Sequence, residues 1–395
     1  MGKKIAMVGC GMMAQALGFD LGRFSPIDEI VLLDNHKERL ENTRKNLKKL
    51  WISERIKGPK LDTVFLDAVE AKNRMDSIFR GTELVVSACP YYLNYSIAEA
   101  AVEAGTNYVD LGGHLETSLK IQGLSKAARK KRLVLMPDVG LAPGIGNAIA
   151  GWGFQNLNHV DSVNIYCGGL PRNKNLPLGY RIAYSPQGLL GMYYGDSVVI
   201  RRSKRISIKT LTEYEKIKFP ALGELEACIV GGATPALWDL PGKVKEFSYK
   251  TLRYPGHFEK FAFLRDIGLA SEQSVAVNGV NVIPRKLLAE VLGKALLKPD
   301  EKDLVAFQTI LEGRKNGKNK KVVFTCLDYG DPKRGFSALA KMTGFAAGSV
   351  CQLILQRKGI FLQPYGYLTP ECNIDGDVYL KELDKRNIKL KVTGK

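Results

Sequence analysis

The chain has 395 residues, of which 45% are hydrophobic and 25% are charged. This balance is typical of an ordinary globular protein with room for two domains. The formal net charge of +18 raises nucleic acid as a partner, but the lysines and arginines are spread along the chain and mixed with acids. We therefore expect a solvated basic surface and no nucleic-acid partner.

The first 34 residues predict a nucleotide-binding unit. Residues 5–8 are an apolar run typical of a short buried strand, and residues 9–14 (GCGMMA) follow it as a tight turn. A helix is expected over residues 15–21 and a second buried strand over residues 29–33, which ends at Asp34. The pattern G-x-G-x-x-A, set between two strands and followed by an acid, is the dinucleotide-binding fingerprint in its required context.

Each position of this turn has a physical role in the fingerprint. Gly9 allows the sharp turn, Gly11 lets the backbone approach a pyrophosphate, and Ala14 lets the helix pack closely on the sheet. Asp34 lies 23 residues after Gly11, near the spacing of a carboxylate that binds both ribose hydroxyls, which favours NAD. Lys37 leaves NADP as the lesser alternative, because it could meet a 2′-phosphate. The expected cofactor contacts here are Gly9, Gly11, Met12, Met13 and Asp34.

Strands and helices alternate up to residue 136. Strands are expected over residues 61–66, 83–88, 108–111 and 133–136, and helices over residues 38–50, 69–79, 96–103 and a stretch ending at residue 132. This alternation predicts an α/β fold with a doubly wound parallel sheet of the Rossmann type. Ligands bind beyond the carboxyl ends of such strands. The candidates there are the turn after residue 8, Asp34, and residues 89–91, 110–114 and 138–144.

The Pro/Gly-rich residues 137–146 mark the exit from this unit. Beyond them an α+β region with a mixed sheet is expected, with strands over residues 161–168, 197–208, 242–252, 274–282 and 321–329 and helices over residues 284–297 and 301–311. Residues 336–357 are strongly helical and are expected to cross back to the first domain. The predicted domains are a dinucleotide-binding domain (1–142), a substrate-binding and dimerisation domain (143–335), and a return helix with a tail (336–395).

Cysteine and histidine usage argues against a metal site. The seven cysteines are scattered, odd in number and never in a C-x-x-C pair, and the four histidines are scattered too. This usage also argues against a disulfide framework and fits a reducing cytoplasm. No apolar run looks long enough to span a bilayer, so a cytoplasmic protein without a membrane partner is expected.

Two stretches carry specific motifs, residues 137–144 (PDVGLAPG) and residues 249–257 (YKTLRYPGH). Together with VGCG, YVDLGG, GGLP, MTGF, residues 184–188 and the closing residues 359–371, they resemble the saccharopine dehydrogenase-like family, most closely its lysine 6-dehydrogenase branch. The resemblance covers nearly the whole chain. It implies an oxidoreductase that moves a hydride from a carbon bearing an amine to nicotinamide, after which water hydrolyses the imine.

The resemblance leaves the substrate open. The nearest branch implies the ε-amino group of L-lysine, and a glutamate-forming saccharopine dehydrogenase or a carboxynorspermidine-type reductase is the alternative. Saccharopine has three carboxylates and needs more cationic groups, which Arg172, Arg181 and Lys250 could supply. An NAD-binding sensor without turnover is the non-enzyme alternative. Because the middle-domain sheet commonly serves for dimerisation in this family, a homodimer or larger homo-oligomer is also implied.

Four polar residues are assigned roles in this reaction. Arg253 is expected to bind the substrate carboxylate through two parallel hydrogen bonds, with a structural ion pair as the alternative. Asp110 is expected to hold the amine and help take its proton, or else to cap the following turn. His257 and His114 have pKa values suited to proton transfer, with His257 preferred, although either could be a bystander.

The remaining candidates follow from their places at strand ends. Tyr91 beside Pro90 is expected near the nicotinamide unless it packs in the core, and Gly144 brings backbone close to a ligand unless it only starts a helix. Cys89 can touch the cofactor but has no base to activate it. The predicted site comprises catalytic Asp110 and His257, substrate-binding Arg253, Tyr91, His114 and Gly144, further cofactor contacts from Cys89, Pro90, Asp110, Leu111 and Pro143, and no metal.

Overall fold

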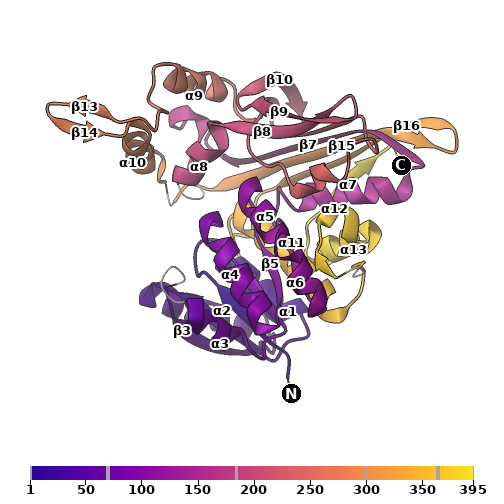
Figure 1. Cartoon of the computed structure of the whole chain (residues 1–395). Helices are drawn as coiled ribbons and strands as arrows, with labels where there is room; N and C mark the ends of the chain where they lie inside the picture. The colour runs from indigo at the N-terminus through magenta and orange to yellow at the C-terminus, as the bar shows by residue number, and fades with distance from the viewer. Residues whose placement is uncertain (1, 68–71, 183–185, 299, 362–364, 395) are drawn as a thin grey trace.

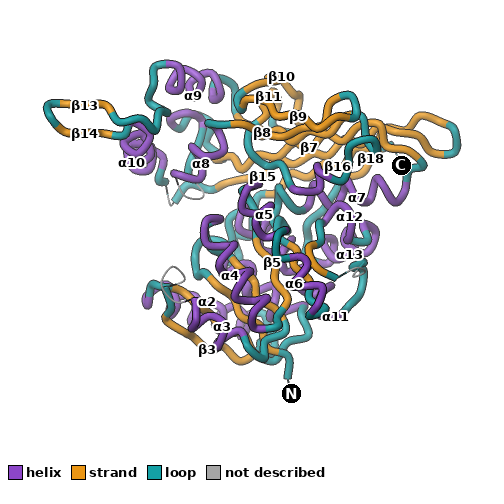
Figure 2. Tube along the Cα trace, in the orientation of Figure 1, coloured by secondary structure: helices purple, strands orange, loops and turns teal. Residues whose placement is uncertain are grey.

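The computed structural model contains two large sheets, one above the other in the view of Figures 1 and 2. It describes residues 2–67, 72–182, 186–298, 300–361 and 365–394. The expected helix over residues 69–79 and the motif stretches 184–188 and 359–371 therefore lie partly outside the described residues. The helix is described from residue 72 as α3 (Lys72–Phe79).

The first sheet has seven parallel strands in the order β17-β6-β5-β4-β1-β2-β3. Its chain order reverses between β1 and β4, which is the switch point at which doubly wound sheets bind ligands. The predicted α/β fold of the Rossmann type is confirmed. The strands are β1 (Lys4–Val8), β2 (Glu29–Asp34), β3 (Lys60–Phe65), β4 (Leu84–Ser87), β5 (Asn107–Asp110), β6 (Val134–Met136) and β17 (Gly366–Tyr367).

Helices cover both faces of this sheet because side chains alternate along each strand. Ile5 and Met7 of β1 pack in one core with α1, α2 and α11, whereas Ala6 and Val8 pack in a second core with α3, α4 and α6. The helices are α1 (Ala14–Phe24), α2 (Lys37–Ser53), α4 (Tyr91–Ala104), α5 (Leu115–Gln122), α6 (Ser125–Lys130), α7 (Ile145–Asn156) and α11 (Ala338–Gln356).

The second sheet has nine strands, with the path β10-β11-β12-β7-β15-β16-β18; β8 pairs with β12, and β9 pairs with β8. β7 and β12 pair in parallel and the other neighbours pair antiparallel, so the expected mixed sheet is confirmed. Its strands are β7 (His159–Pro171), β8 (Asp196–Arg201), β9 (Lys204–Lys209), β10 (Thr212–Phe219), β11 (Gly223–Ile229), β12 (Glu246–Arg253), β15 (Asp303–Lys315), β16 (Lys318–Asp328) and β18 (Lys391–Thr393).

Shorter elements surround the second sheet. The hairpin of β13 (Val275–Val277) and β14 (Val280–Val282) forms a separate two-stranded sheet. The helices are η1 (Pro177–Gly179), α8 (Pro186–Tyr193), η2 (Pro235–Trp238), α9 (His257–Asp266), α10 (Pro284–Leu296), α12 (Pro370–Asn373) and α13 (Gly376–Lys385).

Two expectations for the middle region were wrong, those for residues 301–311 and 274–282. Residues 301–311 were expected as a helix, but residues 303–311 belong to β15, which pairs with β7 and β16 along nearly its whole length. Hydrogen bonding on both sides outweighs the weak helical spacing, and its Val, Phe, Thr and Ile residues suit a strand. Residues 197–208 contain strand segments as expected, namely β8 and β9, which are joined by a turn at Arg202 and Ser203, both with positive φ. Residues 274–282 form the β13–β14 hairpin instead of one strand.

α11 returns the chain to the first sheet and lies against α1. A Cβ added at Gly344 would stand 2.7 Å from the Leu17 nitrogen, so the two helices approach at backbone distance there. Contrary to the expectation from apolar runs, α11 is long and apolar enough to cross a membrane by composition alone. However, 89% of that stretch is buried inside the protein, as in the core helix of a globular fold.

The end of the chain is anchored by a buried arginine. Arg386, just after α13, donates through Nε and Nη2 to the two carboxylate oxygens of Asp20 on α1, at 2.7 and 3.0 Å. It also donates to Glu382 at 2.9 Å and to Gln352 on α11 at 2.7 Å. The last strand, β18, pairs with β16 of the second sheet, so the tail does not pack wholly on the first domain as expected.

Candidate active site

The carboxyl edge of the first sheet faces the second sheet. α5, which follows β5, packs against η2 of the second domain, and α7, which follows β6, packs against β7 and β15. In Figure 1 these two helices lie between the sheets. Residues at the ends of β1, β4, β5 and β6 are therefore turned toward the second domain.

The glycine turn after β1 has the shape that a dinucleotide needs. Gly9 has φ +96°, and a Cβ there would stand 2.9 Å from the carbonyl of Ala88, so only glycine fits this close pass over β4. At Gly11 a Cβ would meet nothing within 4 Å, which leaves open space beside the backbone at the start of α1. Met12 is exposed and Ala14 is fully buried against the sheet. These residues fit a bound dinucleotide, with its phosphates at the N-terminus of α1.

Backbone N–H groups of the glycine turn and of the start of α2 hold the Asp34 carboxylate in place. Its Oδ2 accepts a hydrogen bond from the Cys10 N–H at 2.7 Å and its Oδ1 accepts one from the His36 N–H at 2.8 Å. Arg39, on the first turn of α2, lies 3.3 Å from Oδ1. The nearest cation to the ribose position is thus Arg39, whereas the predicted Lys37 lies over the Phe65 ring.

The end of β4 brings Tyr91 and His114 together. Their rings stack with centroids 4.2 Å apart and an angle of 15° between their planes. The Nδ1 atom of His114 accepts a hydrogen bond from the Thr117 N–H at 3.3 Å, so this histidine caps the N-terminus of α5. Burial lowers the pKa of His114, which favours the neutral form of its ring. At the same edge, burial raises the pKa of Cys89 to about 12, so its thiol stays protonated.

Two buried aspartates meet where β5 and β6 end. The Asp110 carboxylate accepts hydrogen bonds from the Tyr108 hydroxyl at 2.9 Å, the Gly112 N–H at 2.8 Å and the Asp138 N–H at 3.0 Å. With these bonds Asp110 caps the turn that follows β5, which is the second role that the sequence left open for it. Asp138 has φ +63°, and its Oδ2 is a buried oxygen without a hydrogen-bond partner among the described residues. Burial, and then the charge of Asp110, raise the pKa of Asp138 well above its usual range.

The turn after Asp138 carries the predicted Pro143 and Gly144. Gly144 has φ +138°, and a Cβ there would stand 1.7 Å from the Gly140 carbonyl oxygen, so the position accepts only glycine. A Cβ on Gly112 would stand 3.0 Å from the Pro143 ring, and one on Gly140 would stand 2.6 Å from the Leu111 oxygen. The turns after β5 and β6 are therefore packed together.

Glu371 on α12 completes this buried acidic group. Its Oε1 accepts hydrogen bonds from Asn147 at 2.6 Å and from Thr234 of the second domain at 2.7 Å. Its Oε2 is a second buried oxygen without a hydrogen-bond partner in the described part of the chain. Burial raises the pKa of Glu371. Burial, and then the charges of Asp138 and Glu371, raise the pKa of the Tyr367 hydroxyl well above its usual range.

Arg253 and His257 lie in the second domain. The Nε of Arg253 donates to the Tyr193 hydroxyl at 2.8 Å, and that hydroxyl is 2.9 Å from Nε2 of His257. Nδ1 of His257 is 2.8 Å from the Leu178 carbonyl, and burial lowers the pKa of this histidine well below its usual range. Both ring nitrogens of His257 are thus engaged, and it orients Tyr193 and Arg253. In Figure 1 the helix that it begins, α9, lies well apart from β5.

Arg253 nevertheless lies on the face of β12 that is turned toward the first domain. Its neighbour Leu252 packs in the outer core with Tyr166 and Leu170, so Arg253 lies on the opposite face of β12. Cys167 lies on that same inner face, in the core shared with the first domain, and feels the charge of Arg253. Arg253 therefore belongs to the sheet face that is turned toward the acidic group.

Family comparisons divide the chain in the same way as the two sheets. A model described as the saccharopine dehydrogenase NADP binding domain matches residues 5–136, and one described as the saccharopine dehydrogenase C-terminal domain matches residues 140–388. The chain belongs to the saccharopine dehydrogenase family. It is an NAD(P)-dependent oxidoreductase with a nucleotide-binding domain, as the sequence predicted.

Relatives within and around the saccharopine dehydrogenase family are distant. Saccharopine dehydrogenase (NADP(+), L-glutamate-forming) of Schizosaccharomyces pombe is 25% identical over 73% of this chain and 79% of its own length. Alpha-aminoadipic semialdehyde synthase of Mus musculus is 22% identical over 76% of this chain. The match spans only 32% of the length of that protein. The apo saccharopine dehydrogenase of Saccharomyces cerevisiae has the same fold, with a TM-score of 0.76, 20% identity and 99% of each chain covered.

Sequence reasoning missed the roles of Asp138, Glu371 and Arg39. Asp138 and Glu371 stand in family motifs, and Asp138 also lies just beyond the end of a predicted strand, but nothing in the sequence shows that they meet. The positive φ of Asp138 and the unpartnered oxygens become visible only once the two domains are placed together. The sequence indicates a role for Arg39 only weakly, through its position about one helical turn after Asp34.

Proposed function

We propose that this member of the saccharopine dehydrogenase family catalyses the NAD-dependent oxidative deamination of the ε-amino group of L-lysine. Lysine, NAD and water would give the semialdehyde, ammonium and reduced cofactor, and the semialdehyde would then cyclise. A bound nicotinamide dinucleotide supplies the hydride acceptor. The protein binds the substrate, orients the donor carbon and manages the proton of the amine.

The observation that carries this proposal is the pair of unpartnered carboxyl oxygens between the domains. Asp138 Oδ2 and Glu371 Oε2 are buried at the carboxyl edge of the first sheet. A buried acceptor without a donor costs about 1–3 kcal/mol, so a ligand that donates hydrogen bonds there removes that cost. An ammonium group donates three hydrogen bonds and carries the charge that these acids favour. The site therefore suits an amine.

Asp138 is also suited to take the proton of the amine. Hydride leaves the donor carbon only when the amine is neutral, so an acceptor must first remove a proton. A carboxylate with a raised pKa holds such a proton more readily than an exposed one. Asp110, whose two carboxylate oxygens accept three hydrogen bonds, holds the turn in shape and adds the negative charge that raises the pKa of Asp138.

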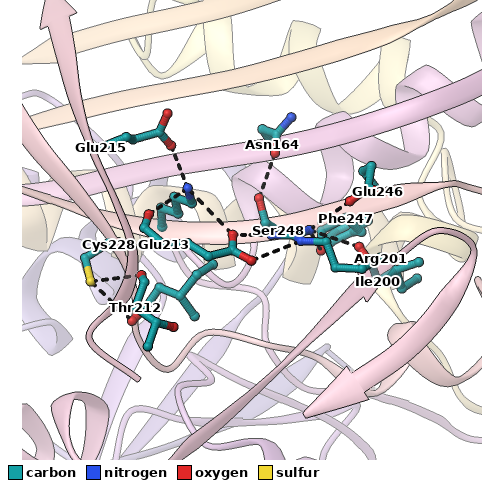
Figure 3. A network of polar contacts seen from close by, with 12 residues as sticks. Asn164, Ile200, Arg201, Thr212, Glu213, Glu215, Cys228, Glu246, Phe247 and Ser248 are labelled. Carbon is teal, nitrogen blue, oxygen red and sulfur yellow. Dashed lines mark hydrogen bonds and ion pairs between the residues drawn. The ribbon is translucent and has the colours of Figure 1, made fainter. Parts of the chain in front are cut away.

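The cations that could bind additional carboxylates are engaged elsewhere, which favours lysine over saccharopine. Lys250 lies on the outer face of β12 and donates to the Glu215 carboxylate at 2.7 Å and to the Glu213 carbonyl at 2.9 Å. Figure 3 shows Glu213 and Glu215 within one polar network. Arg172 donates to the Tyr329 carbonyl at 2.6 Å and stacks over that ring. Arg181 donates to the carbonyls of Lys298 and Glu301. Arg253 also donates to the Tyr193 hydroxyl and the Leu252 carbonyl, and it is our candidate for one substrate carboxylate because it lies on the face of β12 that is turned toward the acidic group.

The test is nicotinamide reduction measured at alkaline pH with lysine and with saccharopine separately, each with NAD and with NADP. Turnover with lysine alone supports the proposal. Turnover with saccharopine alone would make the chain a glutamate-forming saccharopine dehydrogenase, which the named relatives favour. Cofactor binding without turnover of either amine would point to a sensor and would overturn the proposal.

The choice of NAD over NADP rests on Asp34. We expect Asp34→Ser to lower kcat/KM for NAD by about 10–100-fold, because a charged acceptor for the ribose hydroxyls is lost. The same change releases Arg39 for a 2′-phosphate, so activity with NADP should rise. The measurement is the ratio of kcat/KM for the two cofactors in the parent and in the variant.

The control for this variant is Glu38→Ser, which removes an exposed acid from the first turn of α2 and should leave that ratio unchanged. A parent enzyme that prefers NADP, with Asp34→Ser having no effect on the ratio, would show that Asp34 does not select the cofactor.

A further inference from the structure

A cavity of about 380 Å³ lies where α7 and α12 meet the first residues of β7. This volume is within the range of small-molecule sites in proteins. Figure 1 shows α7 and α12 next to each other beneath the second sheet. The lining includes Glu371 and Cys372 of α12 and Gly151 of α7. A Cβ on Gly151 would stand 2.4 Å from the Glu371 carbonyl oxygen, so the two helices touch at backbone distance there.

The cavity is distinct from the amine site. The carboxyl of Glu371 accepts hydrogen bonds from Thr234 and from Asn147, which lies one turn of α7 before Gly151. The described residues that line the cavity do not include Asn147, Asp110 or Asp138. The turns of α7 beyond Gly151 form the wall instead. The proposed reaction therefore gives this space no role.

The apolar part of the lining suits a hydrocarbon chain. It comes from the end of α7, the start of β7, the segment after η2 and the segment before α12, through Phe154, Leu157, Val160, Leu240 and Phe361. Phe361 is 46% exposed. A ligand with an apolar body would remove this surface from water, which is the main favourable contribution to binding for such a group.

The polar part of the lining offers hydrogen-bond donors. Lys243 lines the cavity and has no ion pair or side-chain hydrogen bond among the described residues. Asn158 accepts from the Asn316 N–H through Oδ1 at 2.7 Å, which leaves its NH₂ group as a donor. A carboxylate accepts from both kinds of donor, and a cationic donor makes the stronger bond. The head group that fits here is therefore an anion.

The charge of Lys243 is not compensated by the nearest acid of β7. Asp161 is bound by Lys245 at 2.7 Å and lies 3.3 Å from the His159 ring. Burial, and then the charge of Glu371, raise the pKa of the Cys372 thiol, whereas Lys243 acts in the opposite direction. Lys243 is thus close to this thiol.

The backbone fixes the turn that carries Lys243. Its N–H donates to the Leu240 carbonyl at 2.9 Å, and the Gly242 N–H donates to the Ser203 carbonyl at 3.2 Å. Gly242 has φ +81°, a conformation that favours glycine. A ligand would therefore meet a backbone that is already in place, which lowers the entropic cost of binding.

We propose that this cavity is a second ligand site, which binds a small monocarboxylate with an apolar hydrocarbon chain. The carboxylate lies at Lys243 and Asn158, and the chain packs against Phe154, Leu157 and Phe361. The proposal is independent of the reaction that the enzyme catalyses.

Titration calorimetry of the full chain with three probes tests the class of ligand. Hexanoate should bind with a dissociation constant of about 1 mM or lower. Acetate lacks the chain and hexylamine carries the opposite charge, so each should bind about 10-fold more weakly or worse. No binding of hexanoate, or equal binding of hexylamine, overturns the proposal.

Two lysines of the same turn form a matched pair of variants. Lys243→Met should weaken hexanoate binding by about 10-fold, because the charge-assisted hydrogen bond is lost. Lys245→Met removes the partner of Asp161, which does not line the cavity among the described residues, and should bind hexanoate as the parent does. Unchanged affinity in Lys243→Met would place the carboxylate at another cation, such as Arg253, and would refute the site.

Alkylation of Cys372 by iodoacetamide, followed by mass spectrometry, locates the bound probe. Cys372 is exposed and lines the cavity, whereas the other six cysteines are buried or half-buried. Hexanoate at ten times its dissociation constant should slow alkylation of Cys372 by about 10-fold, and the same concentration of hexylamine should not. Bound hexanoate that leaves this rate unchanged would show that the ligand lies outside the cavity.

Discussion

Replacement of Asp138 by asparagine is expected to lower kcat/KM for amine oxidation by about 100- to 10,000-fold, the range for loss of a positioned proton acceptor. The substituted amide keeps the size of the side chain, and asparagine tolerates the positive φ of this position. The fold should therefore survive. What is lost is the buried Oδ2 that accepts from the amine, together with its capacity to take a proton.

Steady-state kinetics against pH tests this role. Because burial and Asp110 raise the pKa of Asp138, the parent should lose activity as pH falls through a value above the ordinary range of carboxyl groups. In Asp138→Asn that limb should disappear, and binding of the cofactor alone should stay unchanged. Asp62→Asn, at an exposed acid of β3, is the control. A loss of less than 10-fold with the acid limb intact would show that Asp138 is not the acceptor.

Replacement of Arg386 by methionine is expected to destabilise the protein by about 3–5 kcal/mol, because the buried carboxylate of Asp20 would lose the cation that binds both its oxygens. Of its cationic partners in the described part of the chain, Glu382 would keep only Lys385, at 2.6 Å. Arg386 is buried and donates to both oxygens of Asp20 and to Glu382, so no water can take its place cheaply. If the chain unfolds as one unit, its melting temperature should fall by about 4–6 °C.

Thermal unfolding of three variants distinguishes the contribution of the Arg386–Asp20 ion pair from the unspecific effect of a substitution in this segment. Lys389→Met removes an exposed partner of Asp384 in the same segment and should change stability by no more than about 1 kcal/mol. Adding Asp20→Asn to Arg386→Met should restore part of the loss, since it removes one stranded charge. Melting of Arg386→Met within 1 °C of the parent would show that the pair contributes little.

The first sheet was predictable because its signals are local. The apolar runs of β1, β2 and β4, the glycine turn and Asp34 lie within short stretches, and each element follows the one before it. The second sheet depends on pairing between distant segments. The residues of β15 taken alone predicted a helix, but the segment is a strand because it pairs with β7 on one side and β16 on the other. Such tertiary pairing is not visible in a local pattern.

The candidate site was predictable in position and less so in role. Strand ends gave the places of Asp34, Tyr91, His114 and Asp110, and the stacking of Tyr91 on His114 brings two of them together. The roles depend on hydrogen bonds. Both carboxylate oxygens of Asp110 accept hydrogen bonds from the protein, whereas Oδ2 of Asp138 accepts none among the described residues. Glu371 comes from the far end of the sequence.

The most direct test of the proposed reaction follows the hydrogen that leaves the substrate. L-lysine with two deuterium atoms at C6 would be incubated with the protein and NAD, and the mass of the reduced cofactor would be measured. Our account predicts one deuterium in each reduced cofactor and a slower rate than with unlabelled lysine. A reduced cofactor without deuterium, or no reduction with lysine at all, would contradict it.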